Sequence, residues 1–141
     1  MGCHLCEVYC QLQHSMSKDL IKAFKREFPP PLSLLQVEEK KPVSFVMQCR
    51  HCAEPLCVYA CLTGALQKEP DNGIVTVDTE RCIGCWTCTL ACPFGAIKRD
   101  IHRGKSTKCD LCLGEEVPAC VAHCPNEALV CVDTEGDVLP A

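Results

Sequence analysis

Residues 82–93 read CIGCWTCTLACP, which is the spacing C-x2-C-x2-C-x3-C-P. Three thiolates this close together can wrap three metal atoms of one cluster, and Gly84 lets the loop between the first two cysteines curl. The fourth thiolate, on Cys92, follows a short helical turn and points away from the others, and Pro93 ends that turn. The spacing therefore favours a polynuclear cluster over a single metal ion.

The same kind of cysteine group recurs along the chain of 141 residues, which holds 16 cysteines. Residues 49–61 have the spacing C-x2-C-x4-C-x3-C, and residues 109–125 have C-x2-C-x7-C-x3-C-P. An N-terminal group has only three cysteines. This internal repeat with unequal spacers indicates several related sites. The groups are Cys3, Cys6 and Cys10; Cys49, Cys52, Cys57 and Cys61; Cys82, Cys85, Cys88 and Cys92; and Cys109, Cys112, Cys120 and Cys124.

The run at residues 82–93 resembles that of bacterial ferredoxins, in which three cysteines hold one cubane and the fourth holds a neighbouring one. Groups that exchange their fourth cysteines must be neighbours in space. The adjacent second and third groups suit such an exchange, and the first and fourth groups then pair around them. We expect four 4Fe-4S clusters, held by Cys49, Cys52, Cys57 and Cys92; by Cys82, Cys85, Cys88 and Cys61; by Cys109, Cys112, Cys120 and Cys10; and by Cys3, Cys6 and Cys124.

Zinc is the alternative from another class of protein. Structural zinc sites use paired cysteines, typically C-x2-4-C twice, and the fourth group taken alone fits that pattern. A zinc-stapled structural or interaction module therefore stays open beside the iron–sulfur interpretation.

Composition and charge narrow the function further. The first ten residues, MGCHLCEVYC, lack the charged and apolar regions of a signal peptide, so we expect a cytoplasmic, reducing location in which cysteines bind metals. The formal charge of −4 argues against a nucleic-acid partner, and no stretch approaches the roughly 18 apolar residues of a membrane span. Aromatic residues make up only 5% of the chain, so we expect metal clusters to supply much of the core.

The four groups, their order and their x4 and x7 insertions resemble the four-cluster ferredoxin-type subunits of larger oxidoreductases, from about Cys3 to Val132. That family serves formate dehydrogenases, hydrogenases, dimethyl sulfoxide reductase-like enzymes, CO dehydrogenases and aldehyde:ferredoxin oxidoreductases. The resemblance implies an α+β fold of two ferredoxin-like dicluster modules, with small strands and short helices packed around the clusters. Within a single polyferredoxin domain over 1–141, the inner module would span 43–100 and the outer module 1–16 plus 101–133.

The function that this resemblance implies is an electron relay without a catalytic site of its own. Electrons would pass through the clusters between a catalytic oxidoreductase subunit and another redox partner, such as a flavin or NAD subunit or a ferredoxin. Short length and the compact fourth group favour the CO dehydrogenase or aldehyde:ferredoxin oxidoreductase type, with a hydrogenase or formate dehydrogenase subunit as the alternative. Self-association into a cluster wire and an anaerobic source also fit the family.

The first group lacks one cysteine of the family's pattern, and the missing residue would lie just before Met1. We expect the natural chain to start upstream. The alternatives are a three-iron cluster on Cys3, Cys6 and Cys124, or a fourth ligand supplied by Cys131 or His4. A further hypothesis is a redox enzyme with an open catalytic cluster, and its only support is the missing first cysteine.

Apolar patterns between the groups predict the secondary structure. Strands are expected at Leu34–Glu38, Val43–Met47, Ile74–Asp78, Ala96–Lys98 and Leu129–Val132. One long helix is expected over Ser17–Phe28. Its apolar stripe of Leu20, Ile21, Phe24 and Phe28 is expected to pack against the cluster core, with docking of a partner as the alternative. Two further features stay open. His51 is expected near the surface or beside the ligands. The basic stretch forms either a solvated loop, or a charge that compensates the clusters or docks an acidic partner; its residues are Lys98, Arg99, Arg103, Lys105 and Lys108.

Overall fold

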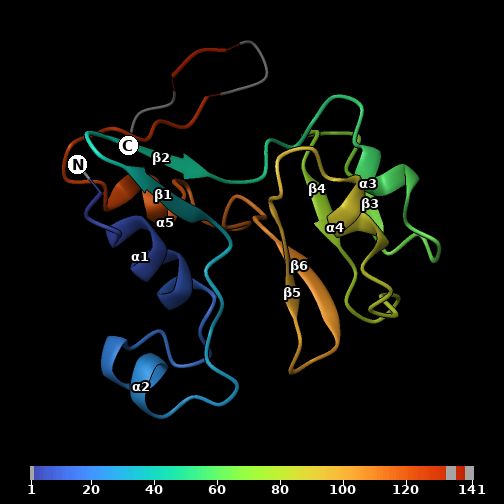
Figure 1. Cartoon of the computed structure of the whole chain (residues 1–141), viewed down its shortest axis with the longest axis horizontal. Coiled ribbons are helices and arrows are strands. Elements are labelled where there is room, and N and C mark those ends of the chain that lie inside the picture. Colours follow the sequence, from blue (N-terminus) through green and yellow to red (C-terminus); the bar gives the residue numbers. More distant parts are fainter. Residues whose placement is uncertain (1, 133–135, 139–141) are drawn as a thin grey trace. The chain divides into compact units, whose positions relative to one another are not determined.

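The computed structural model describes residues 2–132 and 136–138, and in this part of the chain short helices alternate with short two-stranded sheets (Figure 1). The contacts divide the chain into a first unit, residues 1–46 and 111–141, and a second unit, residues 47–110. The small mixed helix and strand architecture agrees with the expected α+β class. The assignment of these units to two dicluster modules stays a prediction.

The second unit repeats the order helix, strand, strand. It contains α3 (Leu56–Tyr59), β3 (Leu66–Lys68) and β4 (Val75–Val77), then α4 (Thr87–Ala91), β5 (Ile97–Asp100) and β6 (Lys105–Lys108). Both strand pairs are antiparallel, with Leu66 opposite Val77 and Ile97 opposite Lys108. Each helix therefore lies within one cysteine group, and each hairpin follows that group.

The core of the second unit is small and aliphatic. Leu66, Val75, Cys88 and Ile97 form its buried cluster, in which each is at most 6% exposed. The partly buried residues against this cluster include three more cysteines, Cys57, Cys61 and Cys92. Thiol groups thus occupy the places around the core where larger apolar side chains would otherwise lie.

The first unit contains α1 (Leu5–Gln13), α2 (Leu20–Lys25), the paired strands β1 (Gln36–Lys40) and β2 (Val43–Met47), and α5 (Ala119–Ala122). Two segments distant in sequence meet where α1 packs against α5, and the rings of Tyr9 and His123 stack there with centroids 3.6 Å apart. No helix within residues 2–132 is long and apolar enough to cross a membrane.

Most of the predicted strands are confirmed, with shifts of one or two residues. The Val43–Met47 strand is found as predicted, and β4 and β5 overlap their predicted segments. The first strand begins at Gln36 rather than Leu34, because Leu34 and Leu35 are buried in the loop that precedes it. The prediction for Leu129–Val132 is wrong, since only an isolated bridge from Val132 to Val138 forms there.

The predicted helix over Ser17–Phe28 is also shorter than expected, and its predicted packing is wrong. Asp19 caps α2 by accepting from the Lys22 amide at 2.9 Å, and the Glu27 carboxylate accepts from the Ser17 amide at 2.7 Å. The capped helix covers little more than one turn and buries only Ala23, at 1% exposure. The predicted apolar stripe is exposed instead, at 50% for Leu20, 65% for Ile21, 47% for Phe24 and 80% for Phe28.

A close approach of two backbones in the second unit requires glycine at position 84. Gly84 has φ 68°, and a Cβ atom there would lie 2.2 Å from the carbonyl oxygen of Gly104. Gly104 has a similar φ of 65°, but a Cβ atom there would meet nothing within 4 Å.

We therefore expect Gly84→Ala to lower the thermal unfolding midpoint much more than Gly104→Ala. Both variants place alanine in the left-handed region, at about 1–2 kcal/mol each. Only the first also forces a steric overlap, which costs a further ~1–3 kcal/mol. Calorimetry on anaerobically purified protein would measure this difference, and equal losses in the two variants would contradict the close approach.

Candidate metal centres

Two cavities in the second unit are each lined by four of the predicted ligand cysteines. Cys49, Cys52, Cys57 and Cys92 line the first, called here the Cys92 cavity. Cys61, Cys82, Cys85 and Cys88 line the second, called the Cys61 cavity. Their empty volumes are similar, about 370 and 310 Å³. In each cavity three cysteines come from one group and the fourth comes from the other group.

The two short helices distribute the cysteines between the cavities. Cys57 lies in α3 and Cys61 lies just beyond its end, while Cys88 lies in α4 and Cys92 is its C-cap. The backbone at Cys92 is extended, with φ −77° and ψ 113°, so the chain leaves the helical path at that residue. Because each helix ends before its second cysteine, the two thiols of one helix line different cavities.

Hydrogen-bond donors surround the sulfur atoms of the Cys61 cavity. The Ala65 amide donates to Cys61 Sγ at 3.2 Å, and the Ser106 amide lies 3.5 Å from Cys82 Sγ. Cys88 Sγ donates to the buried Ser106 hydroxyl oxygen at 3.2 Å, and this hydrogen bond acts to lower the pKa of the thiol. Amide and hydroxyl donors favour sulfur in its thiolate form, which is the form that binds metal.

Burial and neighbouring thiols raise the pKa of one cysteine in each cavity. Burial raises the pKa of the Cys57 thiol, and the neighbouring Cys49 and Cys92 raise it further. The pKa of the Cys88 thiol is raised in the same way, by burial first and then, after the opposing Ser106 hydrogen bond, by its neighbouring thiols. Four crowded thiolates repel one another, so they become stable together only around cations. The donor set fits a thiolate-bound metal cluster.

The opposite effect acts on the two thiols that have more local donors. The Thr87 hydroxyl donates to Cys85 Sγ at 3.5 Å and is the main cause of the lowered pKa of that thiol. Burial acts to raise the pKa of Cys61, but hydrogen bonds from Thr63 and the following backbone outweigh it and lower the pKa.

Three lysines lie against the cysteine loops. Lys108 is 4% exposed, and its Nζ donates to the carbonyl oxygens of Val75 and Cys109. Lys105 Nζ donates to Cys82 O at 2.6 Å, and Lys68 Nζ donates to Cys52 O at 3.1 Å. The solvated-loop interpretation is therefore wrong for Lys105 and Lys108, which belong to β6. These ammonium groups place positive charge where thiolates gather.

His51 lines the Cys92 cavity and leaves one polar atom without a partner. Its Nδ1 accepts from the Val75 amide at 2.9 Å, whereas its Nε2 is buried without a hydrogen-bond partner. Burial, followed by the charge of Lys108, lowers the pKa of this ring to about 4, so it is neutral near pH 7. A buried ring nitrogen without a hydrogen-bond partner, beside four thiols, fits a site that is completed by a bound group.

The cysteines of the first and fourth groups lie mainly in the first unit. Cys6 and Cys10 are buried on α1, and Cys10 Sγ accepts from the Leu34 amide at 3.3 Å. Cys120 is buried on α5, and Cys124 Sγ accepts from the Ala128 amide at 3.3 Å. The division between the units places Cys112 in the first and Cys109 in the second, whereas Cys3 is exposed in the first. The two ligand sets expected here stay predictions.

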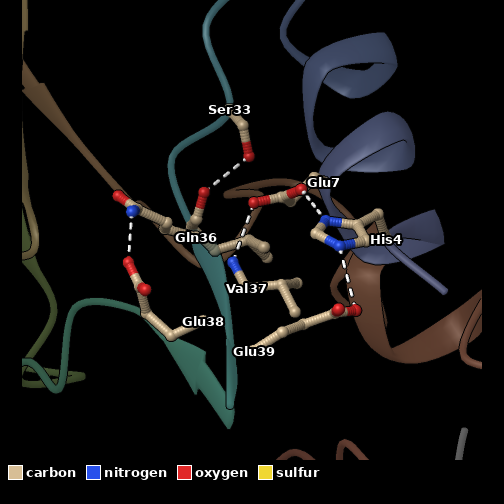
Figure 2. A network of polar contacts seen from close by, with 8 residues as sticks. His4, Glu7, Ser33, Gln36, Val37, Glu38 and Glu39 are labelled. Atoms are coloured by element: carbon tan, nitrogen blue, oxygen red, sulfur yellow. Dashed lines mark hydrogen bonds and ion pairs between the residues drawn. The ribbon is translucent and has the colours of Figure 1, made fainter. Parts of the chain in front are cut away.

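Carboxylates occupy both ring nitrogens of His4, as Figure 2 shows. Nδ1 lies 2.6 Å from Glu7 Oε2, and Nε2 lies 3.2 Å from Glu39 Oε1. The other Glu7 oxygen accepts from the Val37 amide at 2.8 Å, which ties α1 to β1. The Glu7 hydrogen bond is the largest cause of the raised pKa of His4. Neither nitrogen is free to bind iron in this arrangement, so the alternative that His4 completes a cluster loses support.

Comparison with known proteins agrees with this chemistry. The family model of the 4Fe-4S dicluster domain matches residues 42–134. The electron transport protein HydN of Escherichia coli (strain K12) is 35% identical over 149 residues, covering 94% of this chain and 82% of HydN. An iron–sulfur protein of Rhodospirillum rubrum is also 35% identical, covering 96% of this chain and 78% of that protein.

A shorter match includes a component of a named enzyme. One polypeptide of the anaerobic dimethyl sulfoxide reductase of Haemophilus influenzae is 45% identical over 87 residues, covering 59% of this chain and 42% of that protein. These names do not support the narrower prediction of a CO dehydrogenase or aldehyde:ferredoxin oxidoreductase partner. The short length and the compact fourth group, which suggested it, do not carry information about the partner's chemistry.

The cysteine groups, the two four-thiol cavities and these similarities lead to one conclusion: the chain belongs to the 4Fe-4S dicluster domain family and is an iron–sulfur electron-transfer protein.

Proposed function

We propose that this protein relays electrons through four 4Fe-4S clusters between the catalytic subunit of an oxidoreductase and a second redox partner. The observation that carries the proposal is the pair of four-thiol cavities to which α3 and α4, and the residues at their ends, both contribute cysteines. When bound, such clusters take up and release single electrons. The chain itself would hold them, bury them and set their potentials through hydrogen bonds and charge.

The proposed ligand sets follow the exchange of fourth cysteines. In the second unit, Cys92 completes the set of Cys49, Cys52 and Cys57, and Cys61 completes the set of Cys82, Cys85 and Cys88. Both sets are supported by the cavity linings, because three cysteines of one group and one cysteine of the other group line each cavity. In the rest of the chain we propose the third and fourth sets by the same rule, with Cys10 completing Cys109, Cys112 and Cys120, and Cys124 joining Cys3 and Cys6.

The partner is proposed from the names of the relatives. One relative is a component of a dimethyl sulfoxide reductase, and another, 44% identical over 96 residues, is a component of a sulfite dehydrogenase from Allochromatium vinosum. We infer that this chain also accompanies a separate catalytic subunit and has no substrate site of its own. A hydrogenase or formate dehydrogenase is the second candidate, and identification of the polypeptides in the natively purified complex would distinguish the two.

Iron content tests the number of clusters. Protein purified and reconstituted without oxygen is expected to hold roughly 15–16 irons per chain and an equal amount of acid-labile sulfide, because each cubane contains about four irons. Metal and sulfide analysis would measure both. A content near 8 irons would contradict four clusters, and zinc without sulfide would contradict the iron–sulfur assignment.

Paired substitutions test which cysteines share a cluster. The Cys49→Ser and Cys92→Ser variants are expected to damage the same cluster, so the double variant should lose about four irons, as each single variant does. The matched control combines Cys92→Ser with Cys88→Ser, which should damage two clusters and lose about eight irons. Ligation by each group separately predicts the reverse, with additive losses for the first pair and non-additive losses for the control.

Removal of the clusters is expected to unfold the protein. The aliphatic core of the second unit is small, and ligand-binding free energy becomes folding free energy in such domains, whose total stability is only about 5–15 kcal/mol. Circular dichroism during chelation and during heating would follow this loss. A stripped chain that keeps a cooperative thermal transition would show that the fold does not depend on its clusters.

A further inference from the structure

His51 lies in the loop between Cys49 and Cys52 and lines the Cys92 cavity. Its backbone is in the left-handed region, with φ 44°, a conformation that non-glycine residues adopt infrequently. The loop thus holds an imidazole at a fixed place among thiols. The Cys92 cavity is otherwise lined largely by apolar residues, including Pro55, Val75 and Ile97.

One hydrogen bond fixes the position of the ring proton. The Val75 amide can only donate, so His51 Nδ1 must accept this bond and carries no proton. A neutral ring then has its proton on Nε2. His51 therefore presents an N–H donor, rather than a lone pair, at the atom that has no partner.

A buried donor without an acceptor is costly and is rare in native proteins. In the lining of the Cys92 cavity, the acceptors that a cluster would introduce are sulfur atoms. The cavity already has four cysteines for the four irons of a cubane, so the ring is not needed as a ligand.

We propose that the Nε2–H of His51 donates a hydrogen bond to a sulfur atom of the cluster in the Cys92 cavity and raises the reduction potential of that cluster. This inference rests on the proposed function, which places a cluster there. Reduction adds one electron from the redox partner, and no bond to iron forms or breaks. A donor stabilises the more negative, reduced state more than the oxidised state, so its loss should make reduction harder.

The chain offers a variant that removes this donor and little else. In His51→Asn, the amide oxygen can replace Nδ1 as acceptor for Val75, and asparagine tolerates the left-handed backbone better than most residues. His51→Gln extends an amide to the position of Nε2 and can restore a donor. His102→Asn removes an exposed imidazole from the turn between β5 and β6 of the same unit and serves as the control.

Redox titrations followed by electron paramagnetic resonance would measure the potentials of the intact chain and the three variants. We expect His51→Asn to keep full iron content but to lower one midpoint potential. The expected change is about a tenfold drop in the ratio of reduced to oxidised cluster at fixed ambient potential, or about 59 mV for a one-electron couple. His51→Gln should recover most of this shift, and His102→Asn should cause none.

A second measurement uses deuterium exchange. In the wild-type protein, exchange into D2O should introduce a deuterium coupling to the reduced cluster of the Cys92 cavity that is missing from His51→Asn. Unchanged potentials in His51→Asn, or the same deuterium couplings in both proteins, would overturn this inference alone. A strong nitrogen coupling typical of a directly bound imidazole would overturn it in favour of ligation. Wild-type protein without a cubane in this cavity would overturn both this inference and the proposed function.

Discussion

Repulsion among crowded thiolates is the constraint on which the second unit depends. Four cysteine sulfurs line each of two cavities in a domain whose aliphatic core is only a few residues. The surrounding chain responds with donors and cations, from the Ser106 amide and hydroxyl to the buried ammonium group of Lys108. These groups make sense only if negative charge collects on the sulfur atoms, and they prepare the cavities for it before any metal arrives.

The two cavities differ in the kind of donor that they contain. Amides and hydroxyls reach the sulfur atoms of the Cys61 cavity, from residues such as Ala65, Thr87 and Ser106. The Cys92 cavity has an imidazole, on His51. Hydrogen bonds to sulfur are one of the main means by which a protein sets cluster potentials. Two sites with nearly the same thiol spacing can thus work at different potentials.

Local sequence chemistry predicted the parts of the fold that depend on nearby residues. The apolar pattern at Ile74–Asp78 located β4, and the cysteine spacing singled out the thiols that line both cavities. Features that depend on distant partners were missed. The burial of Lys108 requires acceptors at Val75 and Cys109, and the partnering of His4 requires Glu39 from another segment.

The α2 helix shows the limit of periodicity as a signal. Its apolar spacing matches a packed helix, but periodicity reports only that one face is apolar and not that anything covers it. The cap at Asp19 and the hydrogen bond from the Ser17 amide to the Glu27 carboxylate act over a few residues, and the helix covers only Leu20–Lys25. Such competing local hydrogen bonds are individually visible in the sequence, but their outcome depends on the fold of the loop around them.

The sharing of α3 and α4 between two cavities has a consequence for assembly. Each helix supplies one cysteine to each cavity, either from within the helix or from just beyond its end. Binding that orders α3 and α4 around one cavity therefore also orders two of the four cysteines that line the other cavity. Under limiting iron, loading of one cavity is therefore expected to favour loading of the other cavity on the same chain.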